Sequence, residues 1–374
     1  MPRILYDHQA FWIQKHGGVS EYFYHVIRRI RAMSSFSAEL TAPRTNNGYA
    51  RELAGSEPFF RMSDRFFFRG AGRIDSVLRK IHVLPDYEKT NREMALSLLS
   101  SDSFDVFHPT YYDDYFLANV KKPFVVTVFD MTHEMFPGFF PGQEIFLRQK
   151  KTLAERAAGI IAISSTTRDD LCEAYGLDPK KVQVSHLGGP APTPVARGRG
   201  SHILYVGQRS IYKNFSFFLE SIAPFLIKNE VRLIAAGGNP FTSTEKTLIH
   251  RLGVEKFVSH TRVSDDAAFI PLYRDALLFV FPSLYEGFGL PLLAAFAYGC
   301  PVACSNRGSL PEVAGDAAEL FDPENSESIL ETVRRVAESV SLQTALREKG
   351  MRRAGEFSWD RCASEHAKMY ASLI

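Results

Sequence analysis

Short apolar runs alternate with longer amphipathic segments along the whole chain. This alternation is typical of β-α-β units, in which helices connect the strands of a parallel sheet. In the first half it predicts strands over residues 3–6, 106–108, 124–129 and 160–163, and helices over 20–33 and from 168 onward. Ser20 fits the N-cap of the first helix, because its hydroxyl can accept a hydrogen bond from a free backbone N–H.

A segment rich in proline and glycine divides this pattern into two halves. Residues 188–200 hold three prolines and four glycines, a composition that excludes a helix and favours an extended hinge. The alternation then begins again, with strands predicted over 203–206, 231–236, 277–281 and 301–304, and helices over 215–227, 291–298 and 359–373. At 374 residues the chain exceeds the roughly 250–300 residues that one core supports. We therefore predict two α/β units of the Rossmann-like kind, which face each other across a ligand-binding cleft.

The composition is that of an ordinary globular protein, with 45% hydrophobic and 23% charged residues. A formal net charge of +2 gives no reason to expect a concentrated basic face, so we expect no nucleic-acid partner. The four cysteines form no C-x-x-C pair, which argues against a zinc site and suits a reducing cytoplasm. We find neither a secretory signal nor a window approaching the ~18 apolar residues of a spanning helix.

The segment richest in candidate chemistry is residues 281–291, Phe-Pro-Ser-Leu-Tyr-Glu-Gly-Phe-Gly-Leu-Pro. Its loop carries one carboxylate, Glu286, and Gly287 and Gly289 allow the backbone to approach a ligand closely. A helix beginning near Pro291 would direct its N-terminal amides into the same loop, which favours an anion such as a diphosphate. The alternative is an ordinary strand–helix turn with an exposed glutamate.

The second candidate segment is residues 205–214, where a strand runs into a loop that starts at Gly207. This loop presents the guanidinium of Arg209 and the ammonium of Lys213, four residues apart. Two fixed cations stabilise the negative charge that develops on a leaving diphosphate. Taken alone, such a pair is as well explained by a solvated loop.

The third candidate segment is residues 16–22, His-Gly-Gly-Val-Ser-Glu-Tyr, which follows the first predicted strand. Gly17 and Gly18 precede a helix N-terminus, where backbone amides can bind phosphate or sugar oxygens. The alternative is a simple turn.

Together these three segments resemble the retaining glycosyltransferases of family four, which have the GT-B architecture. The resemblance spans nearly the whole chain, and residues 282–291 are its most specific part. Supporting segments are residues 4–8, 107–112, 127–130, 163–164, 310–313 and 357–359. The resemblance implies an acceptor-side domain over 1–188, a linker over 189–200, a nucleotide-sugar domain over 201–356 and a C-terminal helix over 357–374 that packs on the first domain.

Site residues are carried over from this resemblance position by position. Arg209 and Lys213 would bind the donor diphosphate and assist its departure, and Glu286 would hold hydroxyls of the transferred sugar. We name Arg209, Lys213, Glu286 and Asp130 as catalytic candidates. The expected donor-binding positions are Gly17, Gly18, Gly207, Arg209, Lys213, Glu286, Gly287, Phe288, Gly289, Leu290 and Ala294.

The sequence departs from the family pattern at two positions. Ala294 stands where a second glutamate would hold the ribose hydroxyls, and loss of that carboxylate would cost donor binding roughly 1.5–3 kcal/mol. Phe129 stands where a histidine would contact the donor sugar. Asp130, His133 or His108 could supply that contact instead, and His108, His133 and Tyr111 are our acceptor-side candidates.

We therefore expect a hexosyltransferase that moves mannose or glucose from a GDP- or UDP-linked sugar to a glycan or lipid-linked acceptor. The resemblance implies front-face transfer. We expect no cofactor or metal ion, since no two aspartates have the D-x-D spacing. The alternative is a non-catalytic or weakly active sugar-nucleotide-binding protein. A nicotinamide oxidoreductase is excluded because Leu292 occupies the third position of G-x-G-x-x-G, and a P-loop NTPase because its motif is absent.

A basic and aromatic stretch over residues 59–73 suggests contact with a membrane. Arg61, Arg65, Arg69 and Arg73 recur every four residues among five phenylalanines, a composition that can bind anionic lipid surfaces. The alternative is a solvated loop. We expect a cytoplasmic protein that attaches peripherally to the membrane through this stretch.

Overall fold

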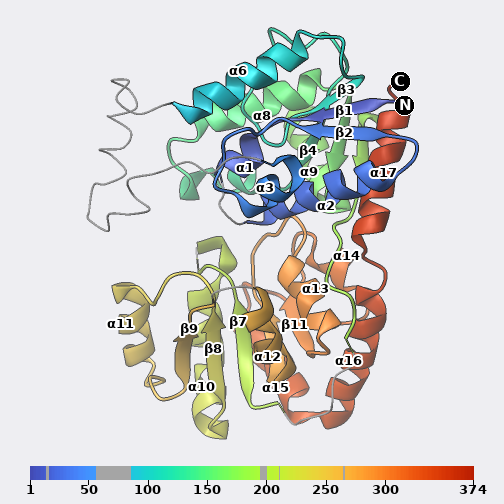
Figure 1. Cartoon of the computed structure of the whole chain (residues 1–374). Coiled ribbons are helices and arrows are strands. Elements are labelled where there is room, and N and C mark those ends of the chain that lie inside the picture. The colour runs from blue at the N-terminus through green and yellow to red at the C-terminus, as the bar shows by residue number, and fades with distance from the viewer. Residues whose placement is uncertain (14–16, 56–85, 194–199, 210, 264–265) are drawn as a thin grey trace.

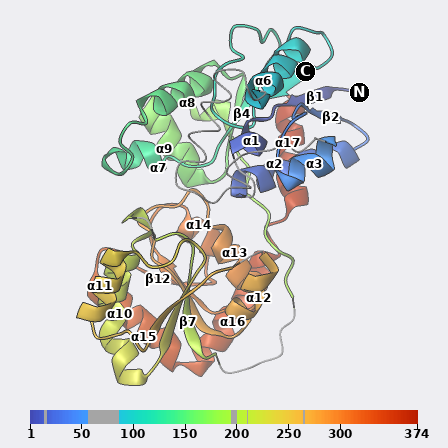
Figure 2. The same cartoon turned by 60° about the vertical axis from the view of Figure 1, so that its left-hand side comes forward.

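The computed structural model describes residues 1–13, 17–55, 86–193, 200–209, 211–263 and 266–374. Within them the chain forms two α/β units stacked end to end, and α17 lies beside both chain termini (Figure 1). The view turned by 60° shows the same two units one above the other (Figure 2). His16 and the four arginines of the predicted membrane contact, Arg61, Arg65, Arg69 and Arg73, lie outside the described residues.

The N-terminal unit is built on short parallel strands, most of whose residues are buried. Strand order is β2-β1-β3 and β4-β5-β6, and a parallel bridge between Phe107 and Phe124 joins the two groups. The strands are β1 (Arg3–Tyr6), β2 (Ser37–Leu40), β3 (Val106–His108), β4 (Val125–Val128), β5 (Gly159–Ala162) and β6 (Val182–Val184). Chain order reverses between β1 and β3, which places a crevice at their carboxyl ends.

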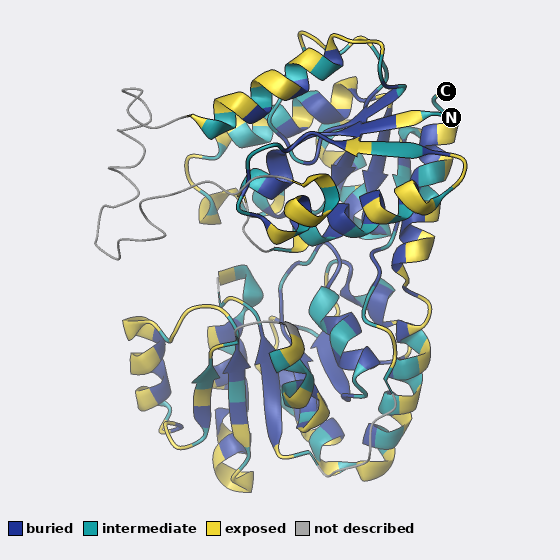
Figure 3. Ribbon diagram, in the orientation of Figure 1, coloured by how far each residue is buried: buried dark blue, intermediate teal, exposed yellow. Residues whose placement is uncertain are grey.

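Helices cover both faces of this sheet. They are α1 (Gln9–Ile13), α2 (Gly18–Ala32), α3 (Gly48–Ala54), α6 (Tyr87–Leu99), α7 (Thr132–Met135), α8 (Glu144–Arg156) and α9 (Ser165–Tyr175), with 3₁₀ turns at Pro137–Phe139 and Pro179–Lys181. Buried residues of α2 recur at helical spacing and pack on the sheet, whereas its opposite face is exposed (Figure 3).

The C-terminal unit has a six-stranded parallel sheet of order β12-β11-β10-β7-β8-β9. Its strands are β7 (His202–Val206), β8 (Arg232–Ala236), β9 (Val258–Thr261), β10 (Ala276–Phe281), β11 (Val302–Ser305) and β12 (Glu319–Phe321). In chain order this is the doubly wound arrangement, and the reversal lies between β7 and β10. The loops that follow these two strands carry the second and first candidate segments.

The helices of this half of the chain lie between its strands or follow the last strand. They are α10 (Phe215–Asn229), α11 (Ser243–Arg251), α12 (Phe269–Arg274), α13 (Leu290–Ala297), α14 (Leu310–Ala314), α15 (Ser326–Glu338), α16 (Val340–Ala354) and α17 (Trp359–Ala371), with 3₁₀ turns at Ile211–Lys213 and Asp266–Ala268. No helix among the described residues combines the length and the apolar character needed to cross a membrane.

The last helix, α17, returns to the N-terminal unit and packs on α2. Its His366 lies 2.7 Å from the Tyr22 hydroxyl, and its Tyr370 hydroxyl lies 2.7 Å from that of Tyr6. These four side chains are fully buried. The hydrogen bonds across the junction satisfy the polar atoms that they bring into the core. The predicted C-terminal helix and its return to the first unit are confirmed.

The predicted strands and helices are present, with ends that differ by at most three residues. The start of α9 lies three residues before the predicted position, and α2 begins two residues early, at Gly18, with Gly17 as its N-cap. Ser20 lies inside the helix, where its hydroxyl donates to the Gly17 carbonyl. Gly17 has an extended backbone, with φ 171° and ψ 160°, and stands at the helix entry, so the expectation that Ser20 is the N-cap is wrong. The exact domain limits stay a prediction.

Candidate active site

The candidate site lies where the carboxyl ends of β7 and β10 face the N-terminal unit. Its cavity measures about 460 Å³. The residues that line it come from both units and are Gly18, Val19, Phe129, Asp130, Ile163, Leu187, Val206, Gly207, Gln208, Tyr212, Lys213, Phe281, Glu286, Gly287, Phe288, Gly289, Leu290 and Pro291. Nine predicted site positions therefore meet in one space: Gly18, Asp130, Gly207, Lys213, Glu286, Gly287, Phe288, Gly289 and Leu290.

Lys213 and Glu286 form the charged centre of this cavity. Lys213 Nζ lies 2.6 Å and 2.8 Å from the two carboxylate oxygens of Glu286, and the Ser283 hydroxyl donates to the same carboxylate at 2.6 Å. Burial is the largest single influence on the pKa of Lys213 and would lower it, but the charge and hydrogen bonds of Glu286, together with Tyr212 and Asp130, outweigh burial and raise the pKa. The ammonium group is therefore charged at neutral pH and stands where an anion can reach it.

The loop that carries Glu286 is held from below by Ser309. The Ser309 hydroxyl donates to the carbonyls of Glu286 and Phe288, at 2.9 Å and 3.0 Å. Gly289 is the N-cap of α13 with φ 109°, a conformation that side chains rarely tolerate. It thereby turns the N-terminus of α13, with its partial positive charge, toward the cavity.

The position of Arg209 differs from the expectation that both cations line the cavity. Its side chain is only 5% exposed, and its Nε donates to Glu245 of α11 at 2.7 Å. Its other nitrogens donate to the carbonyls of Gly237 and Asn239, and its guanidinium stacks over Phe241. In this structure Arg209 thus fixes the loops after β7 and β8 and is not among the residues lining the cavity. Its role toward a diphosphate stays a prediction.

Gly287 lines the cavity and also leaves room for the backbone of the opposite unit, and its approach to a ligand stays a prediction. A methyl group at Gly287 would lie 2.0 Å from the Phe129 carbonyl oxygen and 2.8 Å from Asp130 Cβ. The Glu286 loop therefore packs directly against the loop after β4. Gly18 faces the same space from above, and a methyl group there would lie 4.0 Å from Leu290 Cδ1.

The acceptor-side candidates occupy different surroundings. Asp130 lines the cavity, and its carboxylate accepts the backbone N–H of Thr132 at 2.9 Å. His133 packs its ring on Phe140 and Phe146, and burial lowers its pKa. Tyr111 also contacts Phe146, and burial with the nearby charge of Asp130 raises its pKa to about 12. Of these candidates, only Asp130 lines the cavity described above.

His108 does not reach this cavity. It is fully buried, with Nδ1 2.7 Å from the Tyr370 hydroxyl and Nε2 3.0 Å from that of Thr127. Both ring nitrogens are therefore used inside the junction with α17. This location corrects the expectation of a donor-sugar or acceptor contact for His108, and we assign it a structural role.

A buried polar network that sequence reasoning missed lies at the strand-order reversal of the N-terminal unit. Asp7, directly after β1, accepts the backbone N–H and the hydroxyl of Thr110, both at 2.8 Å. It also accepts the amide of Gln9 and the hydroxyl of Tyr115, at 2.8 Å and 3.1 Å. The signal was available, because Asp7 and Thr110 each follow a predicted strand.

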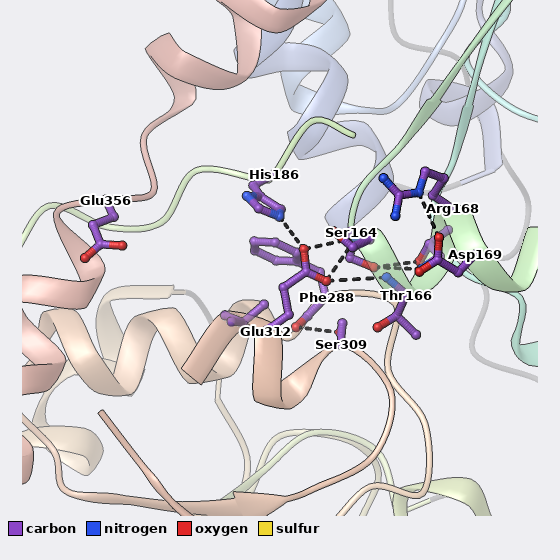
Figure 4. A network of polar contacts seen from close by, with 12 residues as sticks. Ser164, Thr166, Arg168, Asp169, His186, Phe288, Ser309, Glu312 and Glu356 are labelled. Carbon is purple, nitrogen blue, oxygen red and sulfur yellow. Dashed lines mark hydrogen bonds and ion pairs between the residues drawn. The ribbon is translucent and has the colours of Figure 1, made fainter. Parts of the chain in front are cut away.

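A second missed residue, Glu312, joins the two units. It accepts the backbone N–H of Ser165 through both carboxylate oxygens, at 3.0 Å and 2.9 Å, and His186 donates to it at 2.6 Å. Burial alone would raise the pKa of Glu312, but these hydrogen bonds lower it to about 2. Figure 4 shows the carboxylate between His186 and the first turn of α9. Glu312 thus caps a helix of the opposite unit.

Ala294 lines an adjoining cavity of about 450 Å³. This cavity shares Val206, Leu290 and Pro291 with the first one, so the two adjoin each other. The family glutamate expected at position 294 would extend into it. Among the described residues, no group of three or more His, Cys, Asp or Glu side chains is placed to hold a metal ion.

Comparison with known families matches both halves of the chain. Residues 16–188 match the family described as "Glycosyltransferase Family 4", and residues 195–353 match "Glycosyl transferases group 1". The chain is a glycosyltransferase of the family-four type. As a family-four transferase it is an enzyme, which decides against the non-catalytic alternative.

Relatives and solved structures agree with this family-four assignment. The O-antigen chain mannosyltransferase B of Escherichia coli is 25% identical over 343 residues, which cover 82% of this chain and 90% of that protein. The MMP alpha-(1->4)-mannosyltransferase of Mycolicibacterium hassiacum is 29% identical over 237 residues, 61% of this chain and 57% of that protein.

Among solved structures, sucrose-phosphate synthase from Thermosynechococcus elongatus superposes with a TM-score of 0.74 at 16% identity, covering 100% of this chain and 99% of that one. Anabaena HepE in complex with UDP and glucose gives 0.72 at 17% identity, covering 100% of both chains. These structural similarities confirm the predicted GT-B fold.

Proposed function

We propose that this glycosyltransferase moves a hexose, mannose in the first instance, from a nucleoside-diphosphate sugar to a glycan or lipid-linked acceptor in polysaccharide biosynthesis. We further propose that it retains the anomeric configuration and needs no metal ion. The observation that carries the proposal is the Lys213–Glu286 pair beside the N-terminus of α13, in a cavity lined by both units.

The charges of this site suit a diphosphate leaving group. Negative charge accumulates on the diphosphate as the glycosidic bond breaks, and groups oriented before the reaction stabilise it at little reorganisation cost. Lys213 supplies a full positive charge, and the amides at the start of α13 supply the partial charge of a helix N-terminus. These groups would do the work that a divalent cation does in metal-dependent transferases.

Glu286 is placed to hold the transferred sugar. A carboxylate accepts hydrogen bonds from two neighbouring sugar hydroxyls, and a carboxylate already oriented by Lys213 and Ser283 loses little freedom when it does so. The acceptor hydroxyl would then attack on the face from which the diphosphate leaves. The bond from the anomeric carbon to the phosphate oxygen breaks, the bond to the acceptor oxygen forms, and the acceptor proton passes to the departing phosphate oxygen.

The choice of sugar rests on the relatives. Two sequence relatives are named mannosyltransferases, whereas HepE is described with UDP and glucose. Mannose is therefore the first donor sugar to test and glucose the second, each with both GDP and UDP. The membrane contact through Arg61, Arg65, Arg69 and Arg73 is a separate proposal. Binding of the chain to anionic vesicles at low salt, abolished when these arginines become glutamate, would support it.

The direct test is a donor panel of GDP-mannose, UDP-mannose, GDP-glucose and UDP-glucose in the presence of EDTA. We expect one donor to be consumed, slowly by hydrolysis and faster with an acceptor extract. We also expect the new glycosidic bond to have the donor's anomeric configuration by NMR. Glu286→Gln and Lys213→Ala should each lose this turnover.

Three results would contradict particular parts of the proposal. Turnover that appears only when a divalent metal is restored would contradict metal independence. An inverted product would contradict front-face transfer. Unchanged turnover in both variants would contradict the assignment of the site.

A further inference from the structure

The cavity beside Ala294 has a size and lining that suit a nucleoside. It adjoins the cavity that holds Lys213 and the N-terminus of α13, and its walls include the apolar side chains of Val206, Phe269 and Leu290. Ligand sites of this size are mostly apolar and carry a few polar groups that fix orientation. In this cavity a carboxylate and an imidazole come from the opposite unit, and two tyrosines come from the C-terminal unit.

Two helices, α2 of the N-terminal unit and α13 of the C-terminal unit, face each other across the space (Figure 1). On α13, Leu290, Ala294 and Tyr298 line the cavity and recur every four residues, which places them on one face. On α2, Glu21 and Gly18 are three residues apart, and Glu21 and His25 are four apart, so these three also share a face. The approach of Gly18 to Leu290 sets these two faces against each other.

Glu21 and His25 supply an acceptor and a donor at this boundary. Their side chains are 33% and 24% exposed, and Glu21 Oε1 lies 3.9 Å from His25 Nε2. Arg29 lies 3.1 Å from His25 Nδ1 and can only donate, so the proton of the neutral ring is on Nε2, toward Glu21. The ring of His25 also stacks on Trp359, with centroids 4.4 Å apart, which fixes its orientation.

We propose that Glu21 binds the ribose hydroxyls of the donor nucleotide and that His25 orients the Glu21 carboxylate. The carboxylate absent at position 294 would thus be supplied from across the cleft. This inference rests on the proposed function, because it places a nucleoside diphosphate across the two adjoining cavities. It adds a consequence of its own. A ribose contact from the N-terminal unit ties nucleotide binding to closure of the two units.

The test compares UDP and GDP with their 2′-deoxy analogues by isothermal titration calorimetry. With the wild-type chain, removing the 2′-hydroxyl should weaken binding about 10-fold or more, because hydrogen bonds to charged groups are worth roughly 1.5–3 kcal/mol. In Glu21→Ala the ratio between the two nucleotides should fall to about one. Glu21→Gln keeps the size of the side chain and should show an intermediate ratio.

Two further variants make the test specific. Ala294→Glu in the Glu21→Ala background returns a carboxylate to the same cavity from the opposite helix and should restore the preference for the ribonucleotide. Glu144→Ala is the matched control, because Glu144 is also the acidic residue in the first turn of its helix but is exposed on α8. It should leave the ratio unchanged.

The possible outcomes separate this inference from the proposed function. If the wild-type chain binds no nucleoside diphosphate, the proposed function fails. If the wild type distinguishes ribose from deoxyribose and Glu21→Ala does so equally well, only the role of Glu21 is overturned. A wild type that binds both nucleotides equally would also overturn it, and Glu21 would then serve only as the neighbour of His25 on α2.

Discussion

Lys213 Nζ and the carboxylate of Glu286 are 2.6 Å apart, although the two residues follow different strands, β7 and β10. The two strands are neighbours at the point where the sheet reverses its order. Their carboxyl ends therefore deliver a cation and an anion to one place without a long loop from either side. The pairing keeps both side chains in a single orientation before a donor binds, which is the kind of preorganisation that lowers a barrier.

We predict that Lys213→Ala lowers kcat by about 10²–10³-fold, the usual effect of removing one group that stabilises transition-state charge. The donor KM should change less, because the charge on the diphosphate grows as the bond breaks. Steady-state kinetics with the active donor measure both values. The control is Lys228→Ala, an exposed lysine of α10. Equal losses in the two variants, or a change in KM alone, would contradict this role for Lys213.

We predict a different behaviour for Arg209, which is paired with Glu245. Arg209→Ala should destabilise the chain by about 3–5 kcal/mol, since it leaves a buried carboxylate without its cation. If Arg209 also binds the diphosphate, a nucleoside diphosphate should raise the Tm of Glu245→Gln but not that of Arg209→Ala. Thermal unfolding with and without nucleotide measures this. A Tm gain of the same size in both variants would restrict Arg209 to its structural pair.

The sequence predicted the fold because the central strands of both sheets are apolar runs that end in polar or glycine-rich residues. The edge strands β2, β6, β9 and β12 carry polar residues and were not predicted. The sequence also predicted that Lys213 and Glu286 lie close together, since both follow strands that the doubly wound order makes neighbours. These inferences needed only local patterns and one topological rule.

The sequence could not show which of several possible partners a side chain contacts. Arg209 and Lys213 look alike in the sequence, yet Arg209 lies next to Glu245 and the carbonyls of Gly237 and Asn239, which together occupy its guanidinium. His108 follows a strand as a site residue would, but α17 covers it from more than 250 residues away in the chain. Such contacts depend on how distant elements pack.

His366 provides a prediction about pH. Burial lowers the pKa of His366 to about 4 from an ordinary 6.5. Between pH 4 and pH 6.5 the imidazole of His366 is therefore protonated in the unfolded chain and neutral in the folded chain. The stability that α17 gains from a neutral ring is present above pH 6.5 and is lost as the pH falls toward 4, by up to about 3 kcal/mol.

His366→Gln should accordingly show a flatter dependence of unfolding free energy on pH across this interval. Urea unfolding followed by tryptophan fluorescence can measure it, because Trp359 packs at the start of the same helix. The control is His250→Gln, whose side chain is 85% exposed. If the wild type and His366→Gln have the same slope, His366 is not the group that carries this dependence.

Glu312 gives the last prediction, because its charge holds the two units together. Its pKa of about 2 lies below the ordinary 4.5, so its contribution is complete above pH 4.5 and is lost as the pH falls toward 2. Since the carboxylate is 21% exposed, we expect about 1–2 kcal/mol after allowance for solvent screening. Glu312→Gln should lose this stability at pH 7 and should widen the angle between the units, which small-angle scattering would record as a larger radius of gyration.

Glu356→Gln is the matched control from the same region (Figure 4), because its ion pair with Arg353 is 54% exposed at the carboxylate. If Glu312→Gln keeps the wild-type radius and stability at pH 7, the contact across the units is not what keeps them closed.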